Sequence, residues 1–272
     1  MPTVSEKRAT FRRLHESGCF VMPNPWDVGT TLYLQSLGFK ALATTSAGFA
    51  FSRGFADGAV SRAAMLAHIA ELSEVADVPM NADFENGYAH EPADVAESVR
   101  LCVGTGVSGL SIEDFTGDRD DPLYDIDLAV ARLKAARAAI DKAGGEVLLV
   151  GRAEGLIRNR PDMAEILRRL QAYAAAGADC LYAPGLKTRE EIAAVVKAVA
   201  PKAVNVLIGA PLGLTVRDLA ELGVRRISVG GALARAAWGG FIRTARLIAE
   251  SGSFQGFADA APSADIVKGL KR

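Results

Sequence analysis

The feature that most constrains this chain is the alternation of a short apolar run with a helical segment, which occurs eight times. Each run is rich in Val, Ile or Leu and ends in a polar residue or a glycine. The runs cover residues 19–23, 41–45, 78–83, 109–113, 147–152, 179–184, 203–208 and 226–229. This alternation predicts an α/β fold consisting of a single (β/α)8 TIM-type barrel, in which functional groups gather at the carboxyl ends of the strands.

A doubly wound open sheet is the competing fold, since it also alternates strands with helices. No G-x-G-x-x-G pattern follows the first run, and evenly spaced units favour closure into a barrel. We expect residues 1–250 to form the barrel and residues 251–272 to form a tail that packs on it or on a neighbouring subunit. Residues 48–58 and 114–124 are rich in glycine or aspartate and are interpreted as loops that border the site.

Composition narrows the choice of partner. The chain has 272 residues, 50% of them hydrophobic, and a formal net charge of -1 with no block of Lys or Arg. We therefore expect a small-molecule partner rather than a nucleic acid or a membrane surface. Cys19, Cys102 and Cys180 lie apart in apolar contexts, which is typical of reduced core residues. The amino terminus has no signal-peptide pattern and no apolar run approaches ~20 residues, so a cytoplasmic location is predicted.

Acidic residues gather after the second, third and fourth runs: Asp57, Asp83, Glu85, Glu113 and Asp114. Several carboxylates in one mouth repel one another unless a cation neutralises them. All candidate ligands are oxygens, which favours Mg²⁺ or Mn²⁺ over zinc. For any single member, capping of the next helix or exposure to solvent is the alternative interpretation. Asp114 is the weakest candidate, because adjacent strand residues point to opposite faces.

Other polar groups are expected at the same end of the barrel. Arg152 ends an apolar run, where a guanidinium can bind a carboxylate or phosphate, although an ion pair with Glu154 is an alternative. Hydroxyls of Thr45 and Ser46 are suited to an anionic oxygen. Gly230 and the next glycine open a helix where barrels often bind phosphate. His15 and His68 are expected on helix surfaces, and His90 is a minor candidate for the site.

Three segments together resemble the isocitrate lyase and phosphoenolpyruvate mutase superfamily over roughly residues 15–250. They are GFKAL…TSAG at residues 38–48, VPMNADFENGY at residues 78–88 and GLSIED at residues 109–114. The resemblance implies that Asp83 contacts Mg²⁺ most directly, with Asp57, Glu85 and Glu113 acting mainly through water. It further implies that Arg152, together with Asp57 and Glu113, has a catalytic role.

The same resemblance supplies a substrate site and an assembly. It implies that the substrate carboxylate is held by Thr45, Ser46 and Ala47. Arg152 would hold a second anionic oxygen, and Asn205 would lie near the substrate. The last barrel helix would be exchanged between subunits, which implies a homodimer or homotetramer.

Departures from the family pattern limit the reaction. Lyase members carry a Lys-Lys-Cys-Gly loop after the fourth strand, whereas residues 115–122 (FTGDRDDP) contain no lysine and no cysteine. A lysine and asparagine loop of the mutases is also absent, and Ala183 replaces their histidine. Isocitrate and methylisocitrate cleavage are therefore not expected.

We predict a Mg²⁺-dependent lyase that acts on a small 2-oxo or 2-hydroxy carboxylic acid through an enolate. Water, Tyr88 and Glu154 are the candidates for the protonating group. Two alternatives stay open: carbon–phosphorus bond chemistry on a phosphonopyruvate, and a non-catalytic barrel that binds a dicarboxylate.

Overall fold

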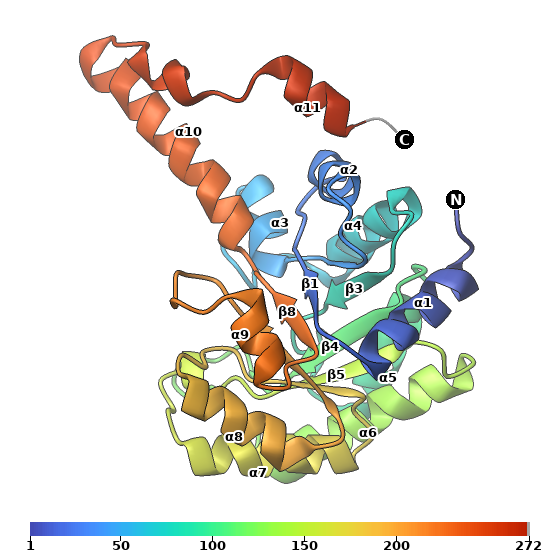
Figure 1. The fold of residues 1–272 in the computed structure, drawn as a ribbon. Coiled ribbons are helices and arrows are strands. Elements are labelled where there is room, and N and C mark those ends of the chain that lie inside the picture. The colour runs from blue at the N-terminus through green and yellow to red at the C-terminus, as the bar shows by residue number, and fades with distance from the viewer. Residues whose placement is uncertain (271–272) are drawn as a thin grey trace.

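The computed structural model describes residues 1–270, which form a nearly closed barrel of parallel strands surrounded by helices (Figure 1). The strands are hydrogen-bonded in the order β1-β8-β7-β6-β5-β4-β3-β2, and every pair is parallel. In these residues the strands are β1 (Phe20–Met22), β2 (Leu42–Ala43), β3 (Met80–Asp83), β4 (Gly109–Glu113), β5 (Leu148–Arg152), β6 (Cys180–Tyr182), β7 (Ala203–Leu207) and β8 (Arg226–Ser228).

Few hydrogen bonds join β1 to β2, where the barrel closes. The Ala43 amide donates to the Pro23 carbonyl at 3.0 Å, and the Asn24 side-chain amide donates to the Thr44 carbonyl at 2.8 Å. Each strand lies within two residues of the range expected from the sequence. The predicted barrel is therefore confirmed, and the open-sheet alternative is wrong.

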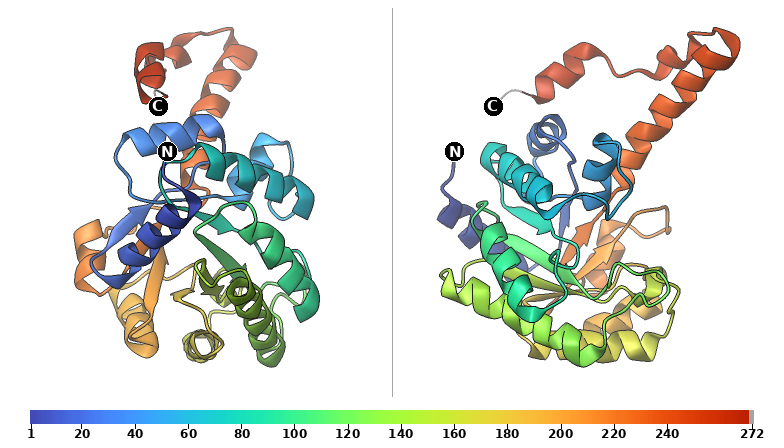
Figure 2. Two further views of the ribbon diagram at one scale, coloured as in Figure 1. Left: turned by 90° about the vertical axis from the view of Figure 1, so that its right-hand side faces the viewer. Right: turned by 180° about the vertical axis from the view of Figure 1, so that it is seen from behind.

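Helices cover the outside of the barrel (Figure 2). Those that follow the strands are α2 (Val28–Ser36), α4 (Arg62–Val75), α5 (Pro92–Val103), α6 (Ile126–Lys142), α7 (Met163–Ala175), α8 (Arg189–Val199), α9 (Val216–Glu221) and α10 (Ala232–Ser251). Additional short elements are α3 (Ser46–Ser52), the 3₁₀ helices η1 (Gly155–Ile157) and η2 (Gln255–Asp259), and α11 (Ser263–Gly269). At the start of α8, Thr188 forms a capping box with Glu191.

The amino-terminal helix α1 (Val4–Glu16) covers the amino-terminal end of the barrel. Its Phe11 is fully buried and packs with Phe20, Met22 and Leu148 on the inner side of the strands. The Lys7 ammonium group reaches the carbonyls of Ser73 and Ala76 at 2.8 and 3.1 Å. Helix α1 therefore closes one end of the barrel and leaves the other end for a ligand.

Side chains alternate between the two faces of each strand. On β3, Met80 and Ala82 pack outward under the helices, whereas Asn81 and Asp83 line the barrel interior. Most of the apolar core therefore lies between strands and helices. The interior itself is polar toward its carboxyl end, which positions the site described below.

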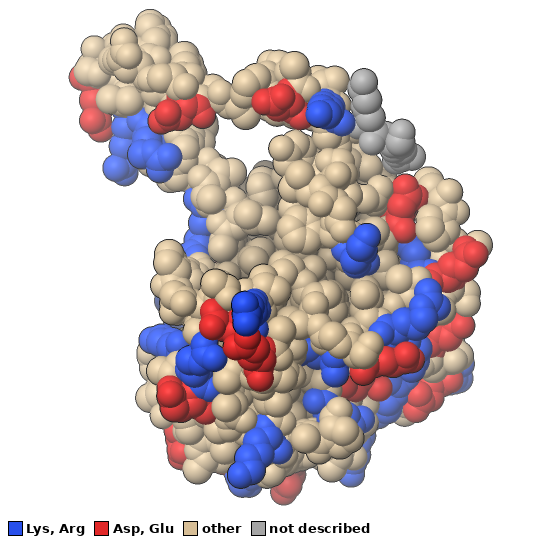
Figure 3. Space-filling model, viewed as in Figure 1, with Lys and Arg blue, Asp and Glu red and all other residues tan. Residues whose placement is uncertain are grey.

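Helix α10 leaves the barrel as an arm, and η2 and α11 return toward α2 (Figures 1 and 2). Only Ala234 is buried in α10, while Trp238, Phe241 and Ile242 are exposed. In Figure 3 the side of the barrel that faces the arm is mostly uncharged, whereas the underside of the outer arm carries side chains of both signs, and positive and negative side chains mix over the lower barrel. Among residues 1–270, no helix has both the length and the apolar character needed to span a membrane.

Candidate active site at the carboxyl end of the barrel

A cavity of about 180 Å³ opens at the carboxyl ends of the strands. Its mouth is lined by the first turn of α3 together with Asp57, Asp83 and Arg152. Its floor lies inside the barrel and includes Asn81 and Arg226. Of the five acidic residues selected from the sequence, Asp57 and Asp83 line this cavity, whereas Glu85, Glu113 and Asp114 do not.

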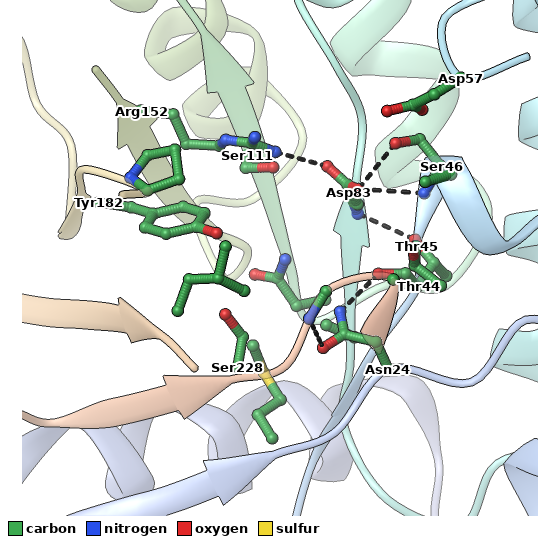
Figure 4. A pocket seen from close by; sticks show the side chains of 18 of the residues that line it. Asn24, Thr44, Thr45, Ser46, Asp57, Asp83, Ser111, Arg152, Tyr182 and Ser228 are labelled. Atoms are coloured by element: carbon green, nitrogen blue, oxygen red, sulfur yellow. Dashed lines mark hydrogen bonds and ion pairs between the residues drawn. The ribbon is translucent and has the colours of Figure 1, made fainter. Parts of the chain in front are cut away.

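Asp83 is the centre of the mouth (Figure 4). Its Oδ1 accepts a hydrogen bond from Arg152 Nη1 at 2.7 Å, and its Oδ2 accepts from the Ser46 amide and hydroxyl, both at 3.0 Å. The Asp83 amide donates to the Thr44 hydroxyl at 2.9 Å. Strands β2, β3 and β5 are thereby tied together at the cavity.

Arg152 bridges three carboxylates. Besides Asp83, its Nη2 lies 3.0 Å from Glu113 and 2.8 Å from Glu154. Burial acts to lower the pKa of Arg152, but the charges of Glu154, Glu113 and Asp83 raise that pKa well above its ordinary value. The guanidinium is therefore permanently charged and fixed in orientation. Arg152 therefore forms the ion pair with Glu154 and also lines the cavity, and the sequence had raised both possibilities.

Glu113 and Glu154 lie behind the arginine rather than in the cavity. Glu113 is 6% exposed and Glu154 is fully buried. Burial raises the pKa of both carboxyls, and for Glu113 the neighbouring Glu154 adds to the rise. Arg158 offsets part of this charge, with its Nη2 at 3.3 Å from Glu154 and 3.9 Å from Glu113.

Asp57 lines the mouth, and Glu85 lies near Asp57 and Asp83 without lining the cavity. Burial, followed by the negative charge of Asp83, raises the pKa of Asp57, but its exposed side chain lets solvent weaken the effect. Burial raises the pKa of Glu85 to about 7, while its Oε1 accepts a hydrogen bond from the Tyr88 hydroxyl at 2.8 Å. Glu85 and Tyr88 both have positive φ, 47° and 57°, so this turn is held in an unusual backbone conformation.

Within residues 1–270, no three His, Cys, Asp or Glu side chains are grouped closely enough to hold a metal ion among them. The local charge nevertheless fits a hard divalent cation bound partly through water. Five carboxylates (Asp57, Asp83, Glu85, Glu113 and Glu154) face two guanidinium groups (Arg152 and Arg158). Burial is the main cause of the raised pKa values of Asp57 and Glu85, and the negative charge of Asp83 adds to both rises.

Thr45, Ser46 and Ala47 lie at the rim as expected, but two of them are already engaged. Thr45 caps α3 by accepting from the Gly48 amide at 3.2 Å, and Ser46 binds Asp83. Gly48 is needed here, because a Cβ would lie 2.6 Å from Thr45 Cγ2 and 3.0 Å from Trp26 Cβ. Residues 46–52 are helical, so the prediction of a loop from residue 48 was wrong at its start.

Asn205 does not reach the mouth. It is fully buried and belongs to a group that we call the floor cluster: Asn81, Asn205, Arg226 and Ser228. Sequence reasoning did not identify this cluster, apart from Asn205. The available signal was Arg226 at the start of an otherwise uncharged strand, two residues before Ser228 and so on the same face.

Asp114 points away from the cavity, as strand alternation predicted. Its Oδ2 accepts from Tyr173 at 2.6 Å and from Arg169 at 3.0 Å, and its Oδ1 accepts from the Glu154 amide at 2.8 Å. The loop that begins there is held by a bridge between Phe115 and Leu123.

The histidines do not line the cavity. His90 is exposed and contacts the Tyr124 hydroxyl at 2.5 Å. His68, expected on the surface, is 4% exposed because its ring stacks on Phe49 of α3 at 3.8 Å. That expectation was wrong, since α3 had not been predicted.

Known proteins resemble this chain along most of its length. The family model described as phosphoenolpyruvate phosphomutase matches residues 11–249. A Mycobacterium tuberculosis protein without an assigned function is 35% identical over 226 residues, 81% of each chain. An oxaloacetate decarboxylase of Paraburkholderia xenovorans is 30% identical over 240 residues, 85% of this chain and 77% of that enzyme. A crystal structure from Burkholderia cenocepacia J2315, provisionally described as a lyase/mutase, is 46% identical with a TM-score of 0.94 and covers 97% of this chain and 96% of its own.

Proposed function

Because the chain belongs to the phosphoenolpyruvate phosphomutase family of the isocitrate lyase superfamily, we propose that it is a divalent-cation-dependent lyase acting on a small 2-oxo or 2-hydroxy carboxylic acid. This family and its structural neighbours comprise lyases and mutases. The observation that carries the proposal is the meeting of Asp83, Arg152 and the first turn of α3 at one small cavity.

A cation would be held by Asp83, with Asp57, Glu85 and Glu113 reaching it through water. Mg²⁺ or Mn²⁺ suits this all-oxygen set, and when bound it would supply positive charge beside the substrate carboxylate and its neighbouring oxygen.

The protein groups would bind and orient the substrate. The rim at Thr45, Ser46 and Ala47 would receive the carboxylate, with Ser46 exchanging its hydrogen bonds to Asp83 for bonds to the substrate. Arg152 would stabilise negative charge on the oxygen of the enolate that forms when the adjacent bond breaks. Glu154 and Glu113 keep the guanidinium charged and aimed, so they would act as positioning residues.

Water is our candidate for the group that protonates the enolate. Neither Tyr88 nor Glu154, the other candidates, lines the cavity. Tyr88 also donates its hydroxyl proton to Glu85, and burial raises its pKa.

A panel of 2-oxo and 2-hydroxy acids tests the proposal. Purified protein with Mg²⁺ is expected to release pyruvate or another 2-oxo acid from one member of the panel, and EDTA should abolish the release. Release of phosphate from phosphonopyruvate would instead support carbon–phosphorus chemistry. Ligand-induced thermal shifts with no product at any metal concentration would contradict catalysis and support a binding barrel.

We also propose that the chain assembles as a homodimer or homotetramer through α10. The support is the row of exposed apolar side chains on this arm, including Trp238, Phe241 and Leu247. Size-exclusion chromatography with light scattering should give a multiple of the 28.6 kDa chain mass. A monomer at micromolar concentration would contradict the assignment.

A further inference from the structure

Arg132 is a buried arginine to which the proposed function assigns no role. It lies on α6, outside the strands of the barrel, and is 1% exposed. Its Nη1 donates to the Ala89 and His90 carbonyls at 2.6 and 2.7 Å, and its Nη2 donates to the Asn86 carbonyl. The guanidinium therefore binds the backbone of one short segment rather than a carboxylate.

That segment is the turn that follows β3, and its backbone is unusual. Glu85, Gly87 and Tyr88 have φ of 47°, 77° and 57°. Left-handed backbone is costly for residues other than glycine and persists only where the surroundings fix it. The carbonyls of residues 86, 89 and 90 converge on the guanidinium, so Arg132 supplies contacts that hold the turn in this conformation.

The same guanidinium supports the loop that follows β4. Its Cζ lies 3.9 Å from the centre of the Tyr124 ring, a cation–π contact. Tyr124 ends this loop, and its amide donates to the Asp114 carbonyl at the start of the loop at 3.0 Å. Asn86 joins the turn to the loop by donating through Nδ2 to the Phe115 carbonyl at 3.2 Å. Arg132 therefore contacts both segments at the place where they meet.

The conformation of the turn decides where Glu85 lies. The Glu85 carbonyl accepts from the Glu113 amide at 3.0 Å, which ties the turn to the end of β4. Its side chain lies near enough to Asp83 for the two negative charges to act on each other. Because Glu85 is itself one of the left-handed residues, relaxation of the turn would change the direction of its side chain.

We propose that Arg132 is a positioning residue, which holds the turn at residues 85–90 and the end of the loop at residues 114–124 and so keeps Glu85 beside Asp83. This inference rests on the proposed function, in which Glu85 reaches a cation through water. Arg132 does not line the cavity and acts only through backbone carbonyls and an aromatic ring. A lysine would keep the charge there, but its single nitrogen cannot reproduce the planar fork.

Hydrogen exchange of the metal-free protein, followed by mass spectrometry, tests this role. In Arg132→Lys we expect residues 84–90 and 114–124 to exchange at least about tenfold faster than in the wild type, because buried carbonyls lose their donor. Exchange in α8, on another side of the barrel, should stay within about twofold. Unchanged exchange in the two segments would overturn the inference, as would an equal acceleration along the whole chain.

Calorimetry with Mg²⁺ gives the second measurement. Arg132→Lys should lower Mg²⁺ affinity about tenfold, since groups that orient metal ligands typically have effects of this size. The matched control is Arg8→Met, because Arg8 also donates to backbone carbonyls, those of Val103 and Val107 at 3.0 Å, but at the amino-terminal end of the barrel. It should change neither Mg²⁺ affinity nor exchange in residues 84–90 and 114–124. An equal loss of Mg²⁺ affinity in both variants would overturn the inference.

Tyr124→Leu tests the contact with the loop separately. It removes the ring from the guanidinium and leaves the bonds to the turn carbonyls in place, so exchange should quicken in residues 114–124 more than in residues 84–90. Should Arg132→Lys fail to fold, this variant decides, and unchanged exchange in the loop would contradict the role of Arg132.

The outcomes separate the positioning role from the proposed function. A wild type that binds no Mg²⁺, together with localised faster exchange in Arg132→Lys, would support the hold on the turn and contradict the cation-dependent function. Full retention of Mg²⁺ affinity in Arg132→Lys would overturn the inference and leave the proposed function intact.

Discussion

Asp114 offers the sharpest test of the charge arrangement, because it is acidic like its neighbour Glu113 but faces the opposite way. Its side chain is 1% exposed and pairs with Arg169, which is 8% exposed. Asp114→Asn preserves shape and an acceptor for the Glu154 amide, but presents an amide donor to the guanidinium. Breaking a buried pair from one side costs about 3–5 kcal/mol. Because Arg169 keeps a contact with Glu165 at 2.7 Å, we expect the lower value, about 3 kcal/mol.

Urea denaturation followed by circular dichroism measures this loss. Thermal unfolding gives a second measurement. For 272 residues the entropy of unfolding is about 0.6 kcal/mol/K, so a loss of about 3 kcal/mol should lower Tm by about 5 °C. The matched control is Asp118→Asn in the same loop, an exposed position where a change below about 0.5 kcal/mol is expected. If the two variants unfold at the same urea concentration, Asp114 is not the structural anchor described above.

Three further predictions concern the site and its support. Asp83→Asn should abolish the thermal stabilisation by Mg²⁺ while the apo protein stays folded; an unchanged Mg²⁺-induced shift would refute the ligand assignment. Arg152→Lys should lower kcat/KM at least about 100-fold, because an ammonium group cannot replace the planar fork, and near-normal turnover would refute that role. Burial lowers the pKa of His68 to about 4, although Asp27 opposes this, so the unfolded state binds more protons between about pH 4 and 6.5. The stability of the wild type should therefore fall by up to roughly 3 kcal/mol as pH drops through that window. The urea midpoint of the wild type should fall accordingly, whereas that of His68→Phe should not show this loss.

The strands were predictable because each combines an apolar run with a helix start or stop signal at its ends. The start of α3 was not predictable from the sequence. A glycine usually indicates a loop, but Gly48 lies inside this helix and allows close packing. Thr45, Trp26 and Ala234 leave no room for a Cβ at that position. A contact between segments so far apart in the chain leaves no local pattern, and the burial of His68 followed from the same helix.

The candidate site was predictable in composition and less so in arrangement. Strand-end reasoning placed Asp83, Arg152 and Asp57 at the cavity and turned Asp114 away from it. The same reasoning could not show that Glu113 pairs with Arg152 instead of lining the cavity. That pairing depends on which of the two strands next to β5 the Arg152 side chain points toward. Arg226 was not predicted because it begins a strand, whereas functional groups in a barrel are expected at the carboxyl ends of the strands.

Helix α10 has two roles along one length. Its first turn packs against the rim, where Ala234 lies 3.3 Å from the position that a Cβ of Gly48 would take, and its remaining turns stand clear of the barrel. A continuous 20-residue helix is about 30 Å long and stiff. A displacement of its outer turns would therefore move the first turn and the rim residues that it contacts, so a partner bound to the outer turns would be mechanically coupled to the proposed carboxylate site.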